Sequence, residues 1–149
     1  MPLPNVIQPV EKADRVLEAC RVADWWTLDA TLAQMLVAMV GDLSARFAAP
    51  RFRGLSIAPK VVIFSGYRSQ SYQAEINPAV TRSCHVQCPS MAVDLRLGTM
   101  PGLIGDEIYS IYGVYWQTLG GRWGGNFSHA GPELINPAEK FHFDLGPCL

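Results

Sequence analysis

The feature that most constrains this chain is an aspartate inside an apolar run, Met91-Ala-Val-Asp94-Leu95. The run reads as a buried strand, where a carboxylate costs free energy unless it is paired, hydrogen-bonded or bound to a metal. His85 lies nine residues before Asp94, and His142 lies in a second short apolar strand near the C-terminus. The fold must therefore supply a partner for Asp94, and the two histidines are candidates.

Two histidines and one carboxylate would complete three of the four positions of a Zn²⁺ ion, and the open fourth position is typical of catalytic zinc. We therefore predict one zinc ion bound by His85, Asp94 and His142. Glu139, three residues before His142, is placed to take the proton of a zinc-activated water as it attacks a carbonyl. Arg68, at the tip of a predicted strand, offers permanent positive charge to the resulting oxyanion.

The same residues have structural interpretations. In the structural interpretation, Asp94 either caps a turn or pairs with Arg96 or Arg68, and Arg68 simply bridges to a carboxylate. His142 and Asp144 share one face of an alternating strand, so Asp144 either simply lines that face or orients the imidazole of His142. We interpret His129 as a structural residue.

The cysteines are Cys20, Cys84, Cys88 and Cys148. A chain of this size has a core and does not need a disulfide framework, and no secretory signal accompanies these cysteines, so we expect free thiols. Cys84 and Cys88 flank His85 and are alternative zinc ligands as thiolates, although their spacing is not that of a C-x-x-C motif.

Composition indicates a single ordered domain over residues 1–149, with an extended lead-in over residues 1–9. The chain is 49% hydrophobic and 17% charged, which is typical of a globular protein with a core. A net charge of −1 argues against nucleic-acid partners. No segment is apolar enough for membrane insertion, and the N-terminus has no secretory pattern. We expect a monomer.

The hydrophobic pattern predicts an α+β fold with a small, largely antiparallel sheet packed by helices. We expect helices over residues 11–25, 28–47 and 103–119, with Thr27 as the N-cap of the second helix and Gly113 as a weak point of the third. An irregular excursion with a helical turn is expected over residues 70–82. The expected strands are residues 60–64, 91–97 and 141–145.

Five short motifs follow one another within residues 60–146. They are Ser65-Gly-Tyr-Arg-Ser, Ser83-x-His85, Ala92-Val-Asp94-Leu, Gly-Arg-Trp123-Gly-Gly and Glu139-x-x-His142-Phe. In this order they resemble the zinc D-Ala-D-Ala peptidase family, which includes D,D-carboxypeptidases, the D,D-dipeptidases of vancomycin resistance and phage L-alanyl-D-glutamate endolysins. The resemblance implies the hedgehog/DD-peptidase fold.

The resemblance also implies a function, namely a zinc metallopeptidase, a hydrolase that cuts peptidoglycan stem peptides at bonds involving D-amino acids. It implies that His85, Asp94 and His142 hold the zinc, that Glu139 is the catalytic base, and that Arg68 binds substrate and oxyanion. The implied substrate-binding residues are Ser83, Tyr67 and Trp123. For Trp123 the match is to an aromatic residue near the cleft, and the alternative is that it serves only in packing. Without a secretory signal, such an enzyme is expected to stay cytoplasmic until its release to the cell wall, as a phage lysis protein does, or to be carried on the virion.

Two departures from the family pattern leave alternatives open. The step from His85 to Asp94 is nine residues instead of the usual seven, and Cys88-Pro89-Ser90 replaces the usual glycine. The insertion either reshapes the rim of the cleft and alters substrate choice, or marks a protein that has lost catalysis. The alternative function is a zinc-containing binding module on the same fold, as in the hedgehog signalling domain. A metal-free structural protein is the third interpretation.

Overall fold

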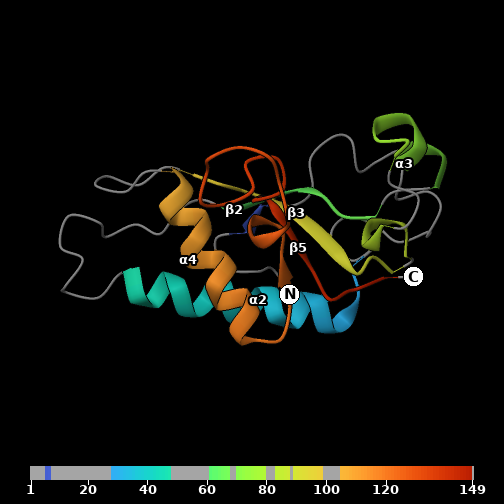
Figure 1. The fold of residues 1–149 in the computed structure, drawn as a ribbon. Coiled ribbons are helices and arrows are strands. Elements are labelled where there is room, and N and C mark those ends of the chain that lie inside the picture. Colours follow the sequence, from blue (N-terminus) through green and yellow to red (C-terminus); the bar gives the residue numbers. More distant parts are fainter. Residues whose placement is uncertain are drawn as a thin grey trace.

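The computed structural model describes residues 6–7, 28–47, 61–67, 70–79, 83–87, 89–98 and 105–148. Its α-helices are α2 (Ala30–Phe47), α3 (Gln70–Ile76) and α4 (Gly105–Thr118), and its 3-10 turns are η4 (Cys84–Val86) and η5 (Gly124–Asn126). Its strands are β1 (Val6–Ile7), β2 (Val61–Ser65), β3 (Ala92–Leu97), β4 (Arg122–Trp123) and β5 (His142–Asp144). The predicted α+β class is confirmed (Figure 1). The helix expected over residues 11–25 lies outside the described residues.

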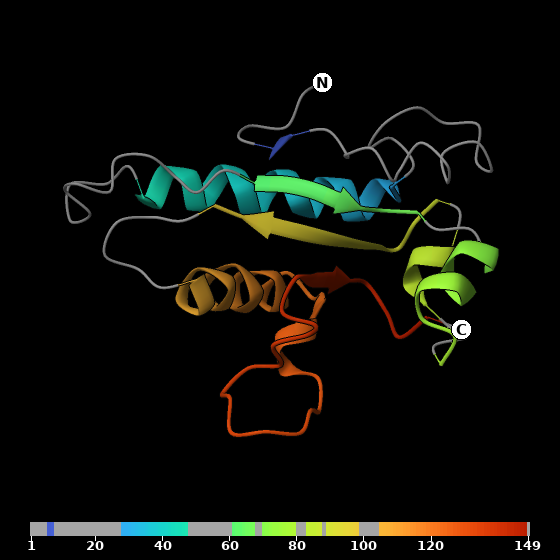
Figure 2. The same cartoon turned by 90° about the horizontal axis from the view of Figure 1, so that it is seen from above.

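The described strands form one sheet in the order β1-β2-β3-β5-β4. β1 is parallel to β2, whereas the pairs β2–β3, β3–β5 and β5–β4 are antiparallel, which confirms the prediction of a largely antiparallel sheet. Helices α2 and α4 lie together along the sheet, and α3 lies apart from them at one end, as both views show (Figures 1 and 2). Helix α3 therefore lies outside the layer that α2 and α4 form along the sheet.

Strand alternation separates the core from a polar face of the sheet. Val93 and Leu95 on β3, together with Phe143 on β5, belong to the apolar cluster that the helices close. Successive side chains of a strand point to opposite faces. Asp94 and His142 therefore project from the face opposite the core.

Helix α2 begins at Ala30, two residues later than predicted, and its cap is Asp29. The Asp29 Oδ1 atom accepts hydrogen bonds from the backbone N–H groups of Thr31, at 2.8 Å, and Leu32, at 3.2 Å. A side-chain oxygen in this position satisfies N–H groups that have no partner within the helix. The predicted cap Thr27 lies outside the described residues.

Helix α4 confirms the third predicted helix, and the structure gives a packing reason for Gly113, the residue expected to weaken it. Gly113 is buried, and a Cβ atom at this position would collide with the indole ring of Trp123. The glycine lets Trp123 pack directly against the helix backbone. Close packing against the sheet therefore explains a residue that helix propensity alone disfavours.

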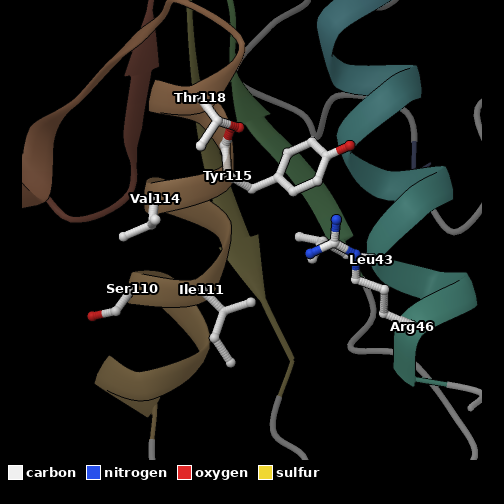
Figure 3. A pocket seen from close by; sticks show the side chains of 7 residues that line it. All are labelled: Leu43, Arg46, Ser110, Ile111, Val114, Tyr115 and Thr118. Carbon is white, nitrogen blue, oxygen red and sulfur yellow. The ribbon is translucent and has the colours of Figure 1, made fainter.

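Helices α2 and α4 are joined by a polar contact at the surface. The Tyr115 hydroxyl donates a hydrogen bond of 2.7 Å to Asp42 Oδ2, and Arg46 Nη2 lies 3.0 Å from the same oxygen. Figure 3 shows the Arg46 and Tyr115 side chains, which come from α2 and α4 and face each other. The Arg46 guanidinium also lies 5.3 Å from the centre of the Tyr115 ring. A largely apolar hollow of ≈ 490 Å³ adjoins this contact.

Among the described helices, none is long and apolar enough to cross a bilayer.

Candidate metal centre

The sheet register places two of the predicted zinc ligands side by side. Asp94 on β3 and His142 on β5 are direct cross-strand partners, and side chains of such a pair are neighbours on one face of the sheet. His85 lies in η4, the turn that precedes β3, and its imidazole reaches the same point. The side chains are only 2% exposed for His85 and 12% exposed for Asp94 and His142.

Local hydrogen bonds fix the position of His85. The Ser83 side chain caps η4, because its Oγ atom accepts a hydrogen bond of 3.2 Å from the backbone N–H of His85. The carbonyl of Cys84 accepts a bond of 3.1 Å from Met91 N–H, which closes the loop between η4 and β3. The longer step between the two ligands is therefore accommodated without separating them.

Three ligand atoms form an almost equilateral triangle. His85 Nε2, Asp94 Oδ1 and His142 Nδ1 lie 3.2 Å from one another along all three edges. In a tetrahedral zinc site with bonds of about 2.0 Å, two ligand atoms lie about 3.3 Å apart. The triangle thus has the size of one face of a zinc tetrahedron. Octahedral Fe²⁺ sites use the same two-histidine, one-carboxylate set, so these residues fit a metal of either kind.

The outer nitrogen of each imidazole is already used. His85 Nδ1–H donates to the carbonyl of Gly66 at 2.6 Å, and His142 Nε2–H donates to Asp144 Oδ2 at 2.7 Å. In the neutral rings, the inner nitrogens therefore present lone pairs to each other and to Asp94. Three electron-rich atoms at one buried point need a cation between them, and metal-binding histidines are oriented by such outer hydrogen bonds.

The carboxylates around His142 favour the protonated form of its imidazole when no metal is bound. Burial by itself would lower the pKa of His142, but the hydrogen bonds and charges of Asp144 and Asp94 outweigh it and raise the pKa to about 9. Burial would raise the pKa of Asp144, yet its hydrogen bonds with His142 and Arg122 lower that pKa to about 2. A proton on His142 thus stands where a metal ion would bind.

Asp144 accepts the hydrogen bond that orients the imidazole of His142, as one of the two interpretations of its position anticipated. Arg122, which the sequence did not single out, holds Asp144. Arg122 Nε and Nη2 each donate a hydrogen bond of 2.8 Å to the Asp144 carboxylate, and the two residues are cross-strand partners of β4 and β5. The only sequence signal for Arg122 was its place in the glycine-rich motif, directly before Trp123.

A cavity of ≈ 980 Å³ opens beside the triangle, and its wall includes the three ligands together with Ser83, Arg122 and Glu139. Asn136, 5% exposed, shapes the turn that carries Glu139. Its side-chain oxygen accepts hydrogen bonds from the backbone N–H groups of Ala138, at 3.0 Å, and Glu139, at 3.1 Å. The predicted base and the predicted ligands therefore share one cavity, and Asn136 is a supporting residue that the sequence did not reveal.

Trp123, predicted to bind substrate, lies in the core instead of on the cavity wall. It is 2% exposed, and its indole N–H donates a hydrogen bond of 2.8 Å to the carbonyl of Lys140. Its position on β4 faces α4 because the neighbouring Arg122 takes the polar face. Tyr67 is half-buried just after Gly66 and does not line the cavity. Arg68 lies outside the described residues, so its role stays a prediction.

The expectation of free thiols is wrong for two cysteines. Cys84 and Cys148 form a disulfide, with their Cα atoms 5.2 Å apart. The chain after β5 returns to η4, which brings together residues separated by 64 positions. Cys84 is therefore not available as a zinc ligand. Cys20 and Cys88 lie outside the described part of the chain.

Neither family models nor curated proteins yield a match to this chain.

Proposed function

We propose that this protein is a zinc-dependent peptidase that hydrolyses peptidoglycan stem-peptide bonds involving D-amino acids. The observation that carries the proposal is the triangle of His85, Asp94 and His142 ligand atoms with 3.2 Å edges, placed on the wall of a large cavity. The substrate class comes from the order of the five motifs, in which these residues occupy the ligand positions of D-Ala-D-Ala peptidases.

The proposed roles rest on the motifs and, for every residue except Arg68, also on where the residue lies. A zinc ion held by the triangle would lower the pKa of a water in its open position to about 7. Glu139, on the same cavity wall, accepts a proton in the reaction as its general base. Arg68 supplies positive charge to the oxyanion. Ser83 both caps the η4 turn and lines the cavity, where it meets the substrate.

A second candidate function is a zinc-containing binding module without catalysis. The placement of Trp123 favours it, because this predicted substrate contact serves the core instead of the cavity. The presence of Glu139 on the cavity wall favours the peptidase, because a binding module has no need of a carboxylate base beside the metal.

Metal binding is the first part of the test. Purified protein is treated with chelator, reloaded with zinc, and analysed for bound metal. We expect one zinc ion per chain in the wild type and a loss of affinity larger than about 100-fold in Asp94→Ala, because a ligand matters more than its outer hydrogen bonds. Asp106→Ala, an exposed aspartate on α4, is the control. Unchanged zinc binding in Asp94→Ala would assign the carboxylate ligand elsewhere, with Asp144 the nearest alternative.

Catalysis is the second part. Zinc-loaded protein is incubated with peptidoglycan, and released fragments are identified by mass spectrometry, so that new termini name the bond cut. We expect Glu139→Gln to keep its zinc and to lose fragment release by at least the roughly 100-fold that general-base catalysis contributes. Glu75→Gln, on the exposed face of α3, is the matched control and should remain active. Zinc binding without fragments in the wild type would favour the binding module.

A further inference from the structure

We infer that Arg122 is a positioning residue that sets the metal affinity of the centre by holding Asp144 against His142. Arg122 contacts none of the three ligand atoms directly. The inference rests on the metal centre of the proposed function and not on the peptidase activity, so the two can be tested separately.

Each oxygen of the Asp144 carboxylate accepts two hydrogen bonds. Its Oδ1 atom accepts hydrogen bonds from Arg122 Nε, at 2.8 Å, and from the backbone N–H of Gly146, at 2.9 Å. Its Oδ2 atom accepts from Arg122 Nη2, at 2.8 Å, and from His142 Nε2, at 2.7 Å. The guanidinium thus donates one hydrogen bond to each oxygen, in the bidentate geometry that only arginine provides. The side chain of Asp144 is 1% exposed, so water does not compete for these bonds.

Arg122 also supports the His142 ring from a second side. Its guanidinium carbon lies 5.3 Å from the centre of the Phe127 ring. The Phe127 ring in turn lies 5.8 Å from the His142 ring, tilted by 52°. One arginine is therefore linked to His142 through a carboxylate on one path and through an aromatic ring on another.

Loss of the guanidinium would act on the metal through His142. Asp144 would keep a buried negative charge without its main counter-charge and would regain rotational freedom. The bond from His142 Nε2–H would then no longer define one orientation of the ring. Since Nδ1 of that ring is the ligand atom, a less defined ring weakens metal binding, and outer-layer changes of this kind typically cost 10–100-fold in metal affinity.

The test compares Arg122→Gln and Arg122→Lys with a matched control, Arg46→Gln. Arg46 makes contacts of the same kinds at the α2–α4 surface, with an aspartate at 3.0 Å and an aromatic ring at 5.3 Å. Zinc affinity is measured by competition with a chelator, and the visible spectrum of the Co²⁺-loaded protein reports the ligand geometry. We expect Arg122→Gln to bind zinc about 10–100-fold more weakly and to shift the cobalt bands. Arg122→Lys keeps the charge but not the bidentate geometry, so its zinc affinity should lie between those of Arg122→Gln and the wild type. Arg46→Gln should bind zinc as tightly as the wild type.

A double-mutant comparison separates this role from a general structural one. If Arg122 acts through Asp144, its replacement should change zinc affinity far less in an Asp144→Asn background than in the wild type. Equal effects in both backgrounds, or wild-type affinity and an unchanged cobalt spectrum in Arg122→Gln, would overturn the inference. Should Arg122→Gln fail to fold, Arg122→Lys decides by the same criteria. Absence of zinc binding in the wild type would overturn the metal centre itself.

Discussion

His142 lies between the two carboxylates of the candidate metal centre. One ring nitrogen faces the Asp94 oxygen at 3.2 Å, and the other donates to Asp144 at 2.7 Å. These two carboxylates raise the pKa of His142 to about 9 against the opposing effect of burial. Proton and metal therefore compete for the same nitrogen, Nδ1.

This competition predicts proton release on metal binding. At pH 7 the metal-free protein carries a proton on His142, and zinc must displace it, so we expect about one proton to be released per zinc bound. Zinc affinity should rise by roughly tenfold per pH unit between pH 7 and 9. Isothermal titration calorimetry in buffers of different ionisation enthalpy counts the protons. Release of no proton at pH 7 would show that His142 is neutral before the metal arrives.

The same pKa shift has a consequence for the metal-free fold. Because the pKa of folded His142 lies above its ordinary value of 6.5, its proton stabilises the fold fully below pH 6.5, and this stabilisation is lost as the pH rises through 9. The zinc-bound protein has no such proton to lose. Thermal unfolding of both forms between pH 6.5 and 9 is therefore the companion measurement to the proton count.

At the scale of elements, helices α2 and α4 each contain an internal glycine. The two glycines differ in the space that tertiary packing leaves for a side chain. Gly41 in α2 has open space where a Cβ atom would lie. Gly113 in α4 has the Trp123 indole there. Helix propensity favours alanine over glycine by about 1 kcal/mol at both positions. If the two alanine substitutions change the free energy of unfolding in opposite directions, the difference comes from packing.

We predict that Gly113→Ala destabilises the protein and that Gly41→Ala, its matched control, stabilises it. The added methyl group at position 113 must displace Trp123 from the core, which typically costs about 1–3 kcal/mol. At position 41 the full propensity gain of up to about 1 kcal/mol remains. Chemical unfolding of both variants measures the signs. Stabilisation by Gly113→Ala would mean that Trp123 does not pack against α4 as described.

At the scale of the whole molecule, a covalent link ties the segment after β5 to the candidate metal centre. The disulfide joins Cys148 to Cys84, the residue next to the ligand His85, across 64 positions of sequence. Such a link stabilises a fold mainly by restricting the unfolded chain. Here it also anchors η4, the turn that presents His85.

We predict that the Cys84→Ser, Cys148→Ser double variant is less stable than the oxidised wild type. Closure of a loop of this length is worth roughly 4 kcal/mol in the chain-entropy account, and zinc affinity should fall as η4 loosens. Thermal unfolding and chelator competition measure the two effects, with the dithiothreitol-treated wild type as an independent way to open the same bond. Unchanged stability in both would show that the bridge does not constrain the chain.

The sequence by itself determined much of the fold and singled out the three residues of the candidate metal site. Periodicity placed α2, α4 and the three main strands close to their observed limits, because apolar side chains must follow the spacing of the element that buries them. Asp94 was found because a carboxylate in an apolar strand needs a partner. Alternation along β5 placed Asp144 on the same face as His142.

Only the tertiary structure decided which distant residues meet. The register that sets Asp94 beside His142, the grip of Arg122 on Asp144 and the Cys84–Cys148 bridge join positions 48, 22 and 64 residues apart. The placement of Trp123 in the core and the need for Gly113 also arise from contacts between elements. Local patterns show which side chains must be buried, but the choice of partner depends on packing between segments that are remote in sequence.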